Sequence, residues 1–270
     1  MALSPEQLKA VFSAAGKRAN RALGQNFCTD GQLLSECVSR AGFPADTAVL
    51  EVGPGLGALT EELLKVCGRV VAVEKDAFLA ETLRSLLPDG RLEIVQGDIL
   101  RVSVRDLFPG SFSVAGNLPY YITTPVLEKF LPLLPDKMLV MLQKEAAARF
   151  TAGPGDRVYG PVPVLTQCFY SVEFLTDVSP DRYYPQPDVV SSVVLLNRNG
   201  TEMDPAFAKG FQAFLNTVFA KRRKTLVNNL PGTGIRDILT GTGLPPDVRA
   251  EAVPPETLLR IHTALLEKEM

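Results

Sequence analysis

The hydrophobic positions between residues 49 and 150 follow two alternating patterns. Short continuous apolar runs, typical of strands buried on both faces, alternate with stretches in which apolar residues recur every three or four positions, as on one side of a helix. The strand-like runs are 49–53, 69–76, 91–98, 111–117 and 137–143, and the helix-like stretches are 58–67, 77–87, 124–134 and 144–150. This alternation predicts an α/β fold with a parallel sheet covered by helices on both faces.

The pattern changes after residue 150. Segment 151–161 is rich in glycine and proline and predicts a loop, and 162–170 has helical spacing. Two further apolar runs, 170–178 and 189–197, are joined by a proline-rich segment. They predict an antiparallel pair of strands at the end of the sheet.

Beyond Gly200 only helical spacing remains. Apolar residues from Phe207 to Phe219 lie on one long helical face, and later glycine- and proline-rich joints separate short helices. The sequence therefore predicts two domains, a sheet domain over residues 1–198 and a small helical domain over residues 199–270.

Composition narrows the class of protein. The chain has 270 residues, of which 46% are hydrophobic and 21% charged, as in ordinary globular proteins. It has no run of about 20 apolar residues that could cross a membrane, and no secretory signal. We therefore expect a cytoplasmic protein that does not bind membranes.

The cysteines and the histidine exclude several kinds of chemistry. The four cysteines are irregularly spaced without a C-x-x-C pair, and His262 is the only histidine. A zinc site, a disulfide framework and a Ser/His or Cys/His hydrolase are therefore disfavoured, and we expect no metal.

A glycine-rich loop predicts the cofactor site. The sequence EVGPGLG, which begins with an acid, places Gly53, Gly55 and Gly57 between the first predicted strand and helix. The third glycine comes one residue too early for the dinucleotide fingerprint, and no G-K-[ST] follows. The loop is either a structural turn or a site for a ligand without pyrophosphate, such as S-adenosyl-L-methionine.

Two acids at strand ends favour the ligand. Glu74 ends the second predicted strand, where it could accept both ribose hydroxyls, and Asp98 ends the third, where it could accept from an adenine amino group. Either acid alone could cap a helix. Because the carboxyl ends of parallel strands form one crevice, the combination predicts a bound adenosyl group.

The tetrapeptide NLPY follows the fourth predicted strand. Asn117 offers an amide oxygen, Leu118 a backbone carbonyl held by Pro119, and Tyr120 an aromatic face. By itself the motif could be an ordinary junction between a strand and a turn. After the glycine loop and the two acids, it predicts a grip on the exocyclic amine of adenine, with two acceptors for the N–H bonds and one ring to stack on the base.

In this order the motifs resemble the S-adenosylmethionine-dependent rRNA adenine N6-dimethyltransferases, in particular the bacterial 16S rRNA (KsgA) group. The resemblance runs from about Lys17 to Leu230. It includes ALGQNF, EVGPGLGALT, VVAVEKD, NLPYYITTPVL, LQKEAAARF, GPGDRVYG, YYPQPDVVSSVV and FAKRRKTLVNNL. The resemblance implies a Rossmann-like methyltransferase sheet with a small all-helical C-terminal domain.

The resemblance also implies roles for individual residues. Those expected to bind the cofactor are Asn26, Cys28, Gly53, Gly55, Glu74, Asp98 and Asn117. Cys28 stands where the family usually has leucine, so its contact is expected through the backbone. Tyr184 stands where the family usually has phenylalanine and is expected to stack on the second face of the base, beside the catalytic set Asn117, Leu118, Pro119 and Tyr120.

The implied substrate is a pair of adjacent adenines in a hairpin loop near the 3′ end of 16S rRNA in the 30S subunit, each methylated twice, with a role in small-subunit biogenesis. The net charge is −2, so contacts to RNA must be local. Two basic clusters, otherwise solvated helix faces, become candidates for phosphate contact. They are Lys17, Arg18 and Arg21, and Lys221, Arg222, Arg223 and Lys224. We expect a monomer.

Three alternatives stay open on the sequence. One is an adenine methylase that acts on 23S rRNA or DNA. Another is a methylase of glutamine amides, which uses NPPY, although Leu118 replaces its first proline. The third is a small-subunit assembly or binding factor for which methylation is secondary.

Overall fold

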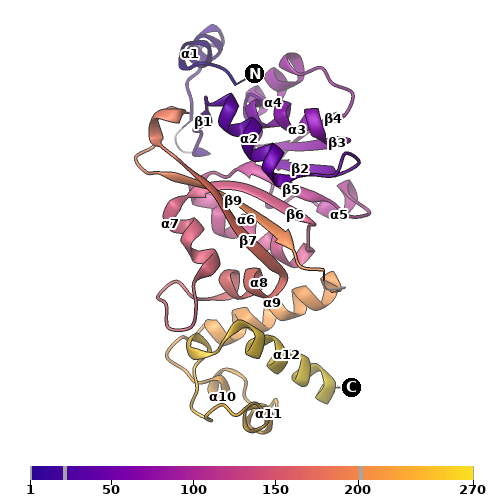
Figure 1. The fold of residues 1–270 in the computed structure, drawn as a ribbon, viewed down its shortest axis with the longest axis vertical. Coiled ribbons are helices and arrows are strands. Elements are labelled where there is room, and N and C mark those ends of the chain that lie inside the picture. Colours follow the sequence, from indigo (N-terminus) through magenta and orange to yellow (C-terminus); the bar gives the residue numbers. More distant parts are fainter. Residues whose placement is uncertain (1, 21–22, 201–202, 270) are drawn as a thin grey trace. The chain divides into compact units, whose positions relative to one another are not determined.

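A computed structural model describes residues 2–20, 23–200 and 203–269 (Figure 1). Contacts divide the chain into two compact units. The first unit contains Met1–Val126, Pro135–Ala147 and Glu173–Asn197, and the second contains Leu127–Leu134, Ala148–Val172 and Arg198–Met270. The second unit thus combines the predicted helical region with two segments from earlier in the chain. The boundary between two domains that the sequence predicts at residue 198 stays a prediction.

A seven-stranded sheet is the centre of the fold, with the order β4-β3-β2-β5-β6-β9-β7. The strands are β2 (Ala48–Val52), β3 (Arg69–Glu74), β4 (Leu92–Gln96), β5 (Ser113–Asn117), β6 (Lys137–Gln143), β7 (Tyr170–Val178) and β9 (Ser191–Arg198). Neighbouring strands are parallel from β4 through β3, β2 and β5 to β6, and β9 runs antiparallel to β6. The predicted parallel sheet with added C-terminal strands is confirmed.

Helices pack on this sheet because their apolar positions share one side. They are α2 (Gly31–Ala41), α3 (Ala58–Val66), α4 (Ala77–Leu86) and α7 (Lys144–Ala147). The other helices in this part of the chain are α1 (Pro5–Ala14), α5 (Val104–Leu107) and α6 (Thr123–Phe130). Buried residues of α2 and α3, among them Leu34 and Leu63, form one core cluster with Val49 of β2 and Leu139 of β6. Burying such side chains contributes about 1.5–3 kcal/mol each.

Two predicted helices are shorter than their hydrophobic patterns. Helix α6 ends at Phe130 and continues as a 3₁₀ turn over Leu131–Leu133, because Pro132 lacks the amide hydrogen that an α-helix would use. Helix α7 ends at Ala147 and continues as a 3₁₀ turn over Ala148–Thr151.

The order in which the chain adds strands to the sheet reverses between β2 and β5. From β2 the chain adds β3 and β4 on one side, whereas β5 and β6 lie on the other. In open α/β sheets, ligands bind beyond the carboxyl ends of the strands at this switch point. The glycine loop follows β2, and the NLPY segment begins at the last residue of β5. The fold therefore places both motifs at the switch point.

A two-stranded pair that the sequence did not predict joins distant segments. Strand β1 (Phe27–Cys28) pairs antiparallel with β8 (Tyr183–Tyr184). Phe27 and Tyr184 pack against a small cluster that contains Leu8 and Phe12 of α1. The pair ties the GQNF segment to the proline-rich segment before β9.

The second unit is mainly helical. Its helices are α8 (Pro161–Phe169), α9 (Pro205–Phe219), α10 (Leu226–Asn229), α11 (Ile235–Thr242) and α12 (Pro255–Glu269). The predicted apolar face of α9 is buried, and its Phe211 ring lies 5.9 Å from the ring of Phe169 on α8. His262 of α12 is buried among the rings of Phe207, Phe211 and Phe214.

Within the described ranges, no helix is long and apolar enough to span a bilayer.

Candidate functional site

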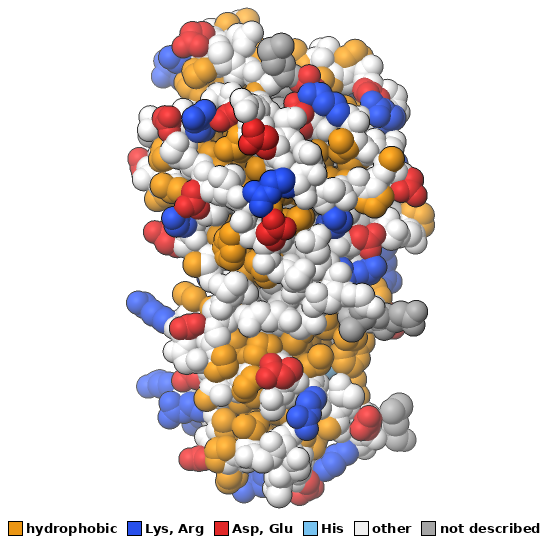
Figure 2. Space-filling model, in the orientation of Figure 1, with side chains coloured by type: hydrophobic (Ala, Val, Ile, Leu, Met, Phe, Trp, Pro, Cys, Tyr) orange, Lys and Arg blue, Asp and Glu red, His pale blue; other side chains and the backbone are white. Residues whose placement is uncertain are grey.

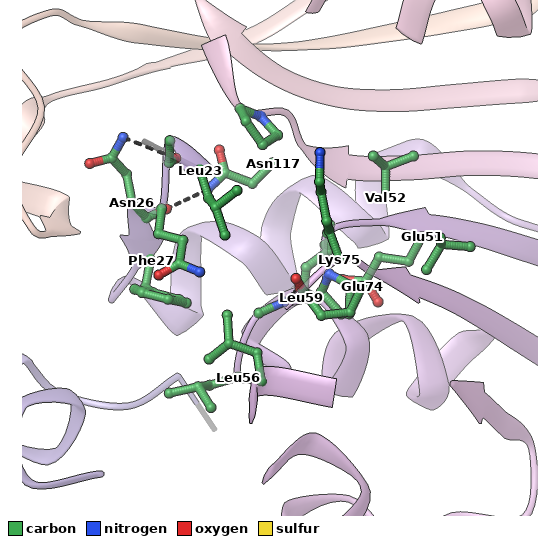
Figure 3. Close-up of a pocket in the computed structure, with 18 of the residues that line it drawn as sticks. Leu23, Asn26, Phe27, Glu51, Val52, Leu56, Leu59, Glu74, Lys75 and Asn117 are labelled. Atoms are coloured by element: carbon green, nitrogen blue, oxygen red, sulfur yellow. Dashed lines mark hydrogen bonds between the residues drawn. The ribbon is translucent and has the colours of Figure 1, made fainter. Parts of the chain in front are cut away.

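A cavity lies at the carboxyl ends of β2, β3 and β5 (Figure 3). The predicted cofactor residues line it together: Asn26, Cys28, Gly53, Gly55, Glu74, Asp98 and Asn117. Pro119 also lines it. Residues that are scattered over more than 90 positions of the chain thus meet at the switch point of the sheet.

The glycine loop leaves room for a ligand against its backbone. Gly53 has a φ of +66°, and a Cβ added there would have no atom within 4 Å. At Gly55, by contrast, an added Cβ would lie 2.8 Å from the ring of Phe27. The first glycine therefore borders open cavity, whereas the second allows close packing with β1.

Glu74 supports the glycine loop through hydrogen bonds to the backbone. Its Oε2 accepts from the backbone N–H of Gly55 at 3.1 Å, and its Oε1 accepts from that of Asp76 at 2.8 Å. Burial raises the pKa of Glu74 despite these hydrogen bonds. A carboxylate has about four lone-pair sites, so Glu74 keeps acceptor capacity for hydroxyl groups of a ligand.

Asp98 lies at the far side of the cavity, paired with Lys75. The Lys75 ammonium is 2.9 Å from Asp98 Oδ2, and the backbone N–H of Leu100 donates to Oδ1 at 3.0 Å. The hydrogen bond from Lys75 is the main cause of a lowered pKa at Asp98. The carboxylate is therefore charged at neutral pH and suited to accept from an amino group.

The Asn117 side chain has a fixed orientation. Its Nδ2 donates to the backbone carbonyl of Asn26 at 2.8 Å, as Figure 3 shows. Because the amide nitrogen is engaged with the GQNF segment, the acceptor Oδ1 is directed away from that carbonyl. This is the orientation that a grip on an exocyclic amine requires.

The rest of NLPY is held in a different way. The backbone N–H of Leu118 donates to the carbonyl of Met141 on β6 at 2.8 Å, and the Leu118 side chain is buried. The Tyr120 hydroxyl lies 2.9 Å from Ser191 Oγ of β9, and burial raises its pKa. The Leu118 and Tyr120 side chains therefore anchor the motif to the sheet and do not line the cavity.

Tyr184 also lies outside the cavity lining. It pairs with Phe27 in the β1–β8 ladder, and the Lys9 ammonium of α1 lies 5.6 Å from its ring centroid.

Cys28, two residues from Asn26, is buried, and burial raises the pKa of its thiol to about 11. The thiol is thus protonated and unreactive at neutral pH.

The residues that line the cavity without having been assigned from the sequence include Glu51, Lys75 and Tyr121. Glu51 was noted only as the acid before the glycine loop, and its complete burial has no signature in the local pattern. Lys75 follows Glu74 directly, so it could have been assigned to the site from its position in the sequence. Tyr121 is 52% exposed at the cavity and could have been found as a second aromatic after NLPY.

The two basic clusters differ in structure. In the first, Lys17 and Arg18 are exposed, with the Lys17 ammonium 4.7 Å from the Phe78 ring centroid, while Arg21 lies outside the described residues. The second cluster follows the end of α9 at Phe219, in a turn. Figure 2 shows basic and acidic side chains interspersed on one face of the molecule, so no broad basic surface covers that face.

Arg222 differs from its neighbours in the second cluster. Its Nε lies 3.0 Å from Glu251 Oε2, and its Nη1 donates to the carbonyl of Arg157 at 2.8 Å. Gly155 of the same loop donates its N–H to the Glu251 carbonyl at 2.8 Å. Arg222 therefore braces the 153–157 loop, whereas Lys221, Arg223 and Lys224 extend into solvent.

The cavity suits S-adenosyl-L-methionine in chemistry and space. Open volume lies against the Gly53 backbone, carboxylates stand at the ends of β3 and β4, and Glu51 adds a buried acid for a cationic ligand. No group of three or more metal-binding side chains is found in the described parts of the chain.

The sequence matches known proteins over nearly its whole length. The model of the family described as "Ribosomal RNA adenine dimethylase" matches residues 16–267. A "Ribosomal RNA small subunit methyltransferase A" from Deinococcus radiodurans is 38% identical over 97% of this chain and 91% of the relative. A protein of the same name from Pediococcus pentosaceus is 35% identical over 97% of this chain and 95% of the relative.

Solved structures share the fold. A dimethyladenosine transferase from Plasmodium falciparum superposes with a TM-score of 0.73 at 21% identity, over 90% of this chain and 98% of the other. The 23S rRNA methyltransferase ErmE superposes with a TM-score of 0.64 at 25% identity, over 88% of this chain and 99% of the other. The expected Rossmann-like methyltransferase fold is confirmed.

Proposed function

Because the chain belongs to the ribosomal RNA adenine dimethylase family, we propose that it dimethylates the N6 amino groups of two adjacent adenines in the hairpin loop near the 3′ end of 16S rRNA, within the 30S particle. The methyl donor is S-adenosyl-L-methionine, and the modification belongs to small-subunit biogenesis. The names of the two small-subunit methyltransferases support this target over 23S rRNA.

The hydrogen bond from Asn117 to Asn26 carries the proposal. Adenine N6 is a weak nucleophile because its lone pair is delocalised into the ring. With Nδ2 engaged, Asn117 Oδ1 accepts one N–H of the amine, and the Leu118 carbonyl accepts the other. These bonds favour a pyramidal nitrogen with its lone pair directed at the donor methyl, so that acceleration comes from orientation and proximity.

The remaining parts of NLPY position this grip. Pro119 fixes the backbone next to the Leu118 carbonyl and offers no N–H of its own. Tyr120 stacks on the base, with its ring orientation set by the hydroxyl contact to Ser191. Tyr184 covers the second face of the base once RNA is bound. Stacking of this kind is worth about 1–3 kcal/mol per base.

The chain's own residues hold the cofactor. Glu74 accepts hydrogen bonds from the ribose hydroxyls, and Asp98 accepts one from the adenine amino group. The backbone at Gly53 and Asn26 borders the methionine part of the cofactor. When bound, S-adenosyl-L-methionine supplies an activated methyl group on a sulfonium. The reaction then needs no histidine, and the nitrogen loses its proton after the transfer.

Two clusters of basic residues contact the RNA. Lys17, Arg18 and Arg21 form the first contact, and Lys221, Arg223 and Lys224 the second, through phosphates that position the substrate without reading its sequence. Arg222, assigned from the sequence to the same contact, acts indirectly by bracing the 153–157 loop. The protein acts as a cytoplasmic monomer.

Tritiated methyl transfer tests the function. The protein is incubated with labelled S-adenosyl-L-methionine and undermethylated 30S particles, 50S particles, or free 23S rRNA, and the labelled nucleoside is identified. We expect N6,N6-dimethyladenosine from 30S particles only, and none with Asn117→Ala. Labelling of 50S particles or 23S rRNA in place of 30S would overturn the proposed target.

A further inference from the structure

Glu51 is a buried acid that lines the cavity. The methyl transfer proposed at NLPY gives it no role. It lies on β2, two residues before Gly53, and lines the cavity although its side chain is only 1% exposed. Its Oε2 has no hydrogen-bond partner among the described residues. A buried carboxylate in this condition costs several kcal/mol unless it is neutral or paired with a cation.

The surroundings of Glu51 supply no such cation. Glu74 of β3 bears on it as a like charge, and the Thr60 hydroxyl of α3, which lowers the pKa of Glu51, is a neutral group. Lys75 lines the same cavity, but its ammonium is held by Asp98. Figure 3 shows Glu51, Glu74 and Lys75 around one side of the site. The free protein therefore favours the neutral acid at Glu51.

We propose that Glu51 is protonated in the free protein and releases its proton to solvent when a cationic group of the methyl donor binds, so that cofactor binding and proton release are coupled. This inference rests on the proposed function, because the cation is that of S-adenosyl-L-methionine. The ligand carries two positive groups, an α-ammonium and a sulfonium, and either would turn the buried acid from a neutral group into an ion-pair partner.

The pKa of Glu51 is consistent with this coupling. Burial, with a smaller addition from Glu74, raises it to about 8. At pH 7 the free protein then holds about 0.9 proton at this site, and a bound cation lowers the pKa again. Affinity for the cofactor should accordingly rise by nearly tenfold between pH 6 and pH 7.

Titration calorimetry in buffers with different ionisation enthalpies measures the released protons directly, without methyl transfer. We expect the wild-type protein to release close to one proton at pH 7, and Glu51→Gln to bind more weakly and release almost none. Glu62→Gln is a matched control, because Glu62 is a buried acid on α3 that pairs with Lys65 at 2.7 Å outside the cavity. It should behave as the wild type.

The range is kept at pH 6.0–7.5 because the α-amino group of the ligand itself titrates near pH 8. The difference between wild type and Glu51→Gln removes that contribution. S-adenosylhomocysteine, which keeps the ammonium but lacks the sulfonium charge, identifies the cation. Release with both ligands assigns the ammonium, and release with the methyl donor alone assigns the sulfonium; both outcomes support the proposal.

Tight binding without proton release in the wild type would overturn the proposal, even if Glu51→Gln fails to fold. Unchanged release in a folded Glu51→Gln protein would overturn it as well. Failure of the wild type to bind either ligand would instead reject the proposed cofactor.

Discussion

The side-chain amide of Asn117 donates to the backbone carbonyl of Asn26 over 2.8 Å, which joins the end of β5 to the segment before β1. Asn117→Asp keeps the size of the side chain and an acceptor oxygen, but places a negative charge against that carbonyl. We expect methyl transfer to fall by about 100-fold or more, as when a positioned group is lost from an active site. Single-turnover rates with 30S particles measure the change.

Asn229→Asp is the matched control, since Asn229 Nδ2 makes a similar bond to the Val218 carbonyl at 2.9 Å, in the second unit. Its transfer rate should stay near that of the wild type. An equal loss in both variants, or full activity of Asn117→Asp, would contradict the role of Asn117.

The hydroxyl and the ring of Tyr120 can be separated by substitution. Tyr120→Phe loses only the contact to Ser191, so we expect a loss of less than about tenfold in kcat/KM for 30S particles, matched by Ser191→Ala. Tyr120→Ala also loses the stacking face, worth about 1–3 kcal/mol, and should lose a further factor of about 10 to 100. If the alanine and phenylalanine variants are equally active, Tyr120 does not stack on the base.

Asp98 can be tested through cofactor binding alone. Asp98→Asn keeps the shape but gives up the charge that Lys75 supports, and we expect the Kd for S-adenosylhomocysteine to rise by about tenfold. Calorimetry measures the Kd. Asp106→Asn on α5, an exposed acid outside the cavity, should leave it unchanged; a Kd for Asp98→Asn within twofold of wild type would exclude the adenine contact.

The raised pKa of Glu51 also predicts how stability varies with pH. Between the ordinary pKa of 4.5 and the value of about 8, the folded state binds more protons than the unfolded state. The free energy of unfolding should therefore fall, by up to about 1.4 kcal/mol per pH unit, as pH rises through this window. Glu74, whose pKa is also raised, acts in the same direction.

Urea unfolding at pH 5, 6.5 and 8 compares wild type with Glu51→Gln in the absence of ligand. The variant should gain stability relative to wild type as pH rises, because it carries no titrating group at this position. A constant difference across the three pH values would show that the folded state does not retain the Glu51 proton.

Arg222 and Arg223 are adjacent, yet their substitutions should differ. Arg223→Gln removes an exposed charge, and we expect weaker 30S binding, a salt dependence reduced by about one unit of slope and an unchanged Tm. Arg222→Gln loses the contacts to Glu251 and Arg157, and should also cost about 1 kcal/mol of stability. Equal Tm values for the two variants would argue against the brace. Filter binding and thermal unfolding supply both measurements.

The sheet was predictable because its strands are buried on both faces and therefore appear as continuous apolar runs. Strands β1 and β8 were not, because two residues carry no periodicity and their partners are about 155 positions apart. This pair nevertheless connects Phe27, which packs against Gly55, to Tyr184. Local patterns contain no information about such a contact.

The site shows the same limit. Glu74, Asp98 and Asn117 could be assigned because each ends a recognisable strand. The burial of Glu51 arises from packing of β2 against its neighbours, and the brace at Arg222 from a contact to Glu251, 29 positions away. In the sequence, Glu51 is one acid before a glycine and Arg222 is one of four equivalent charges.

The second unit draws on three separate stretches of the chain, and this limits how the protein can be divided. A chain shortened to residues 1–198 would keep α8 but lose α9 and α12, both of which contact it. Phe169 would lose the Phe211 ring, and the Tyr159 hydroxyl would lose the Val253 carbonyl it contacts at 2.7 Å. Such a fragment would expose apolar surface and aggregate. Residues 1–198 are therefore not an independently folding fragment that could be fused to another RNA-binding module.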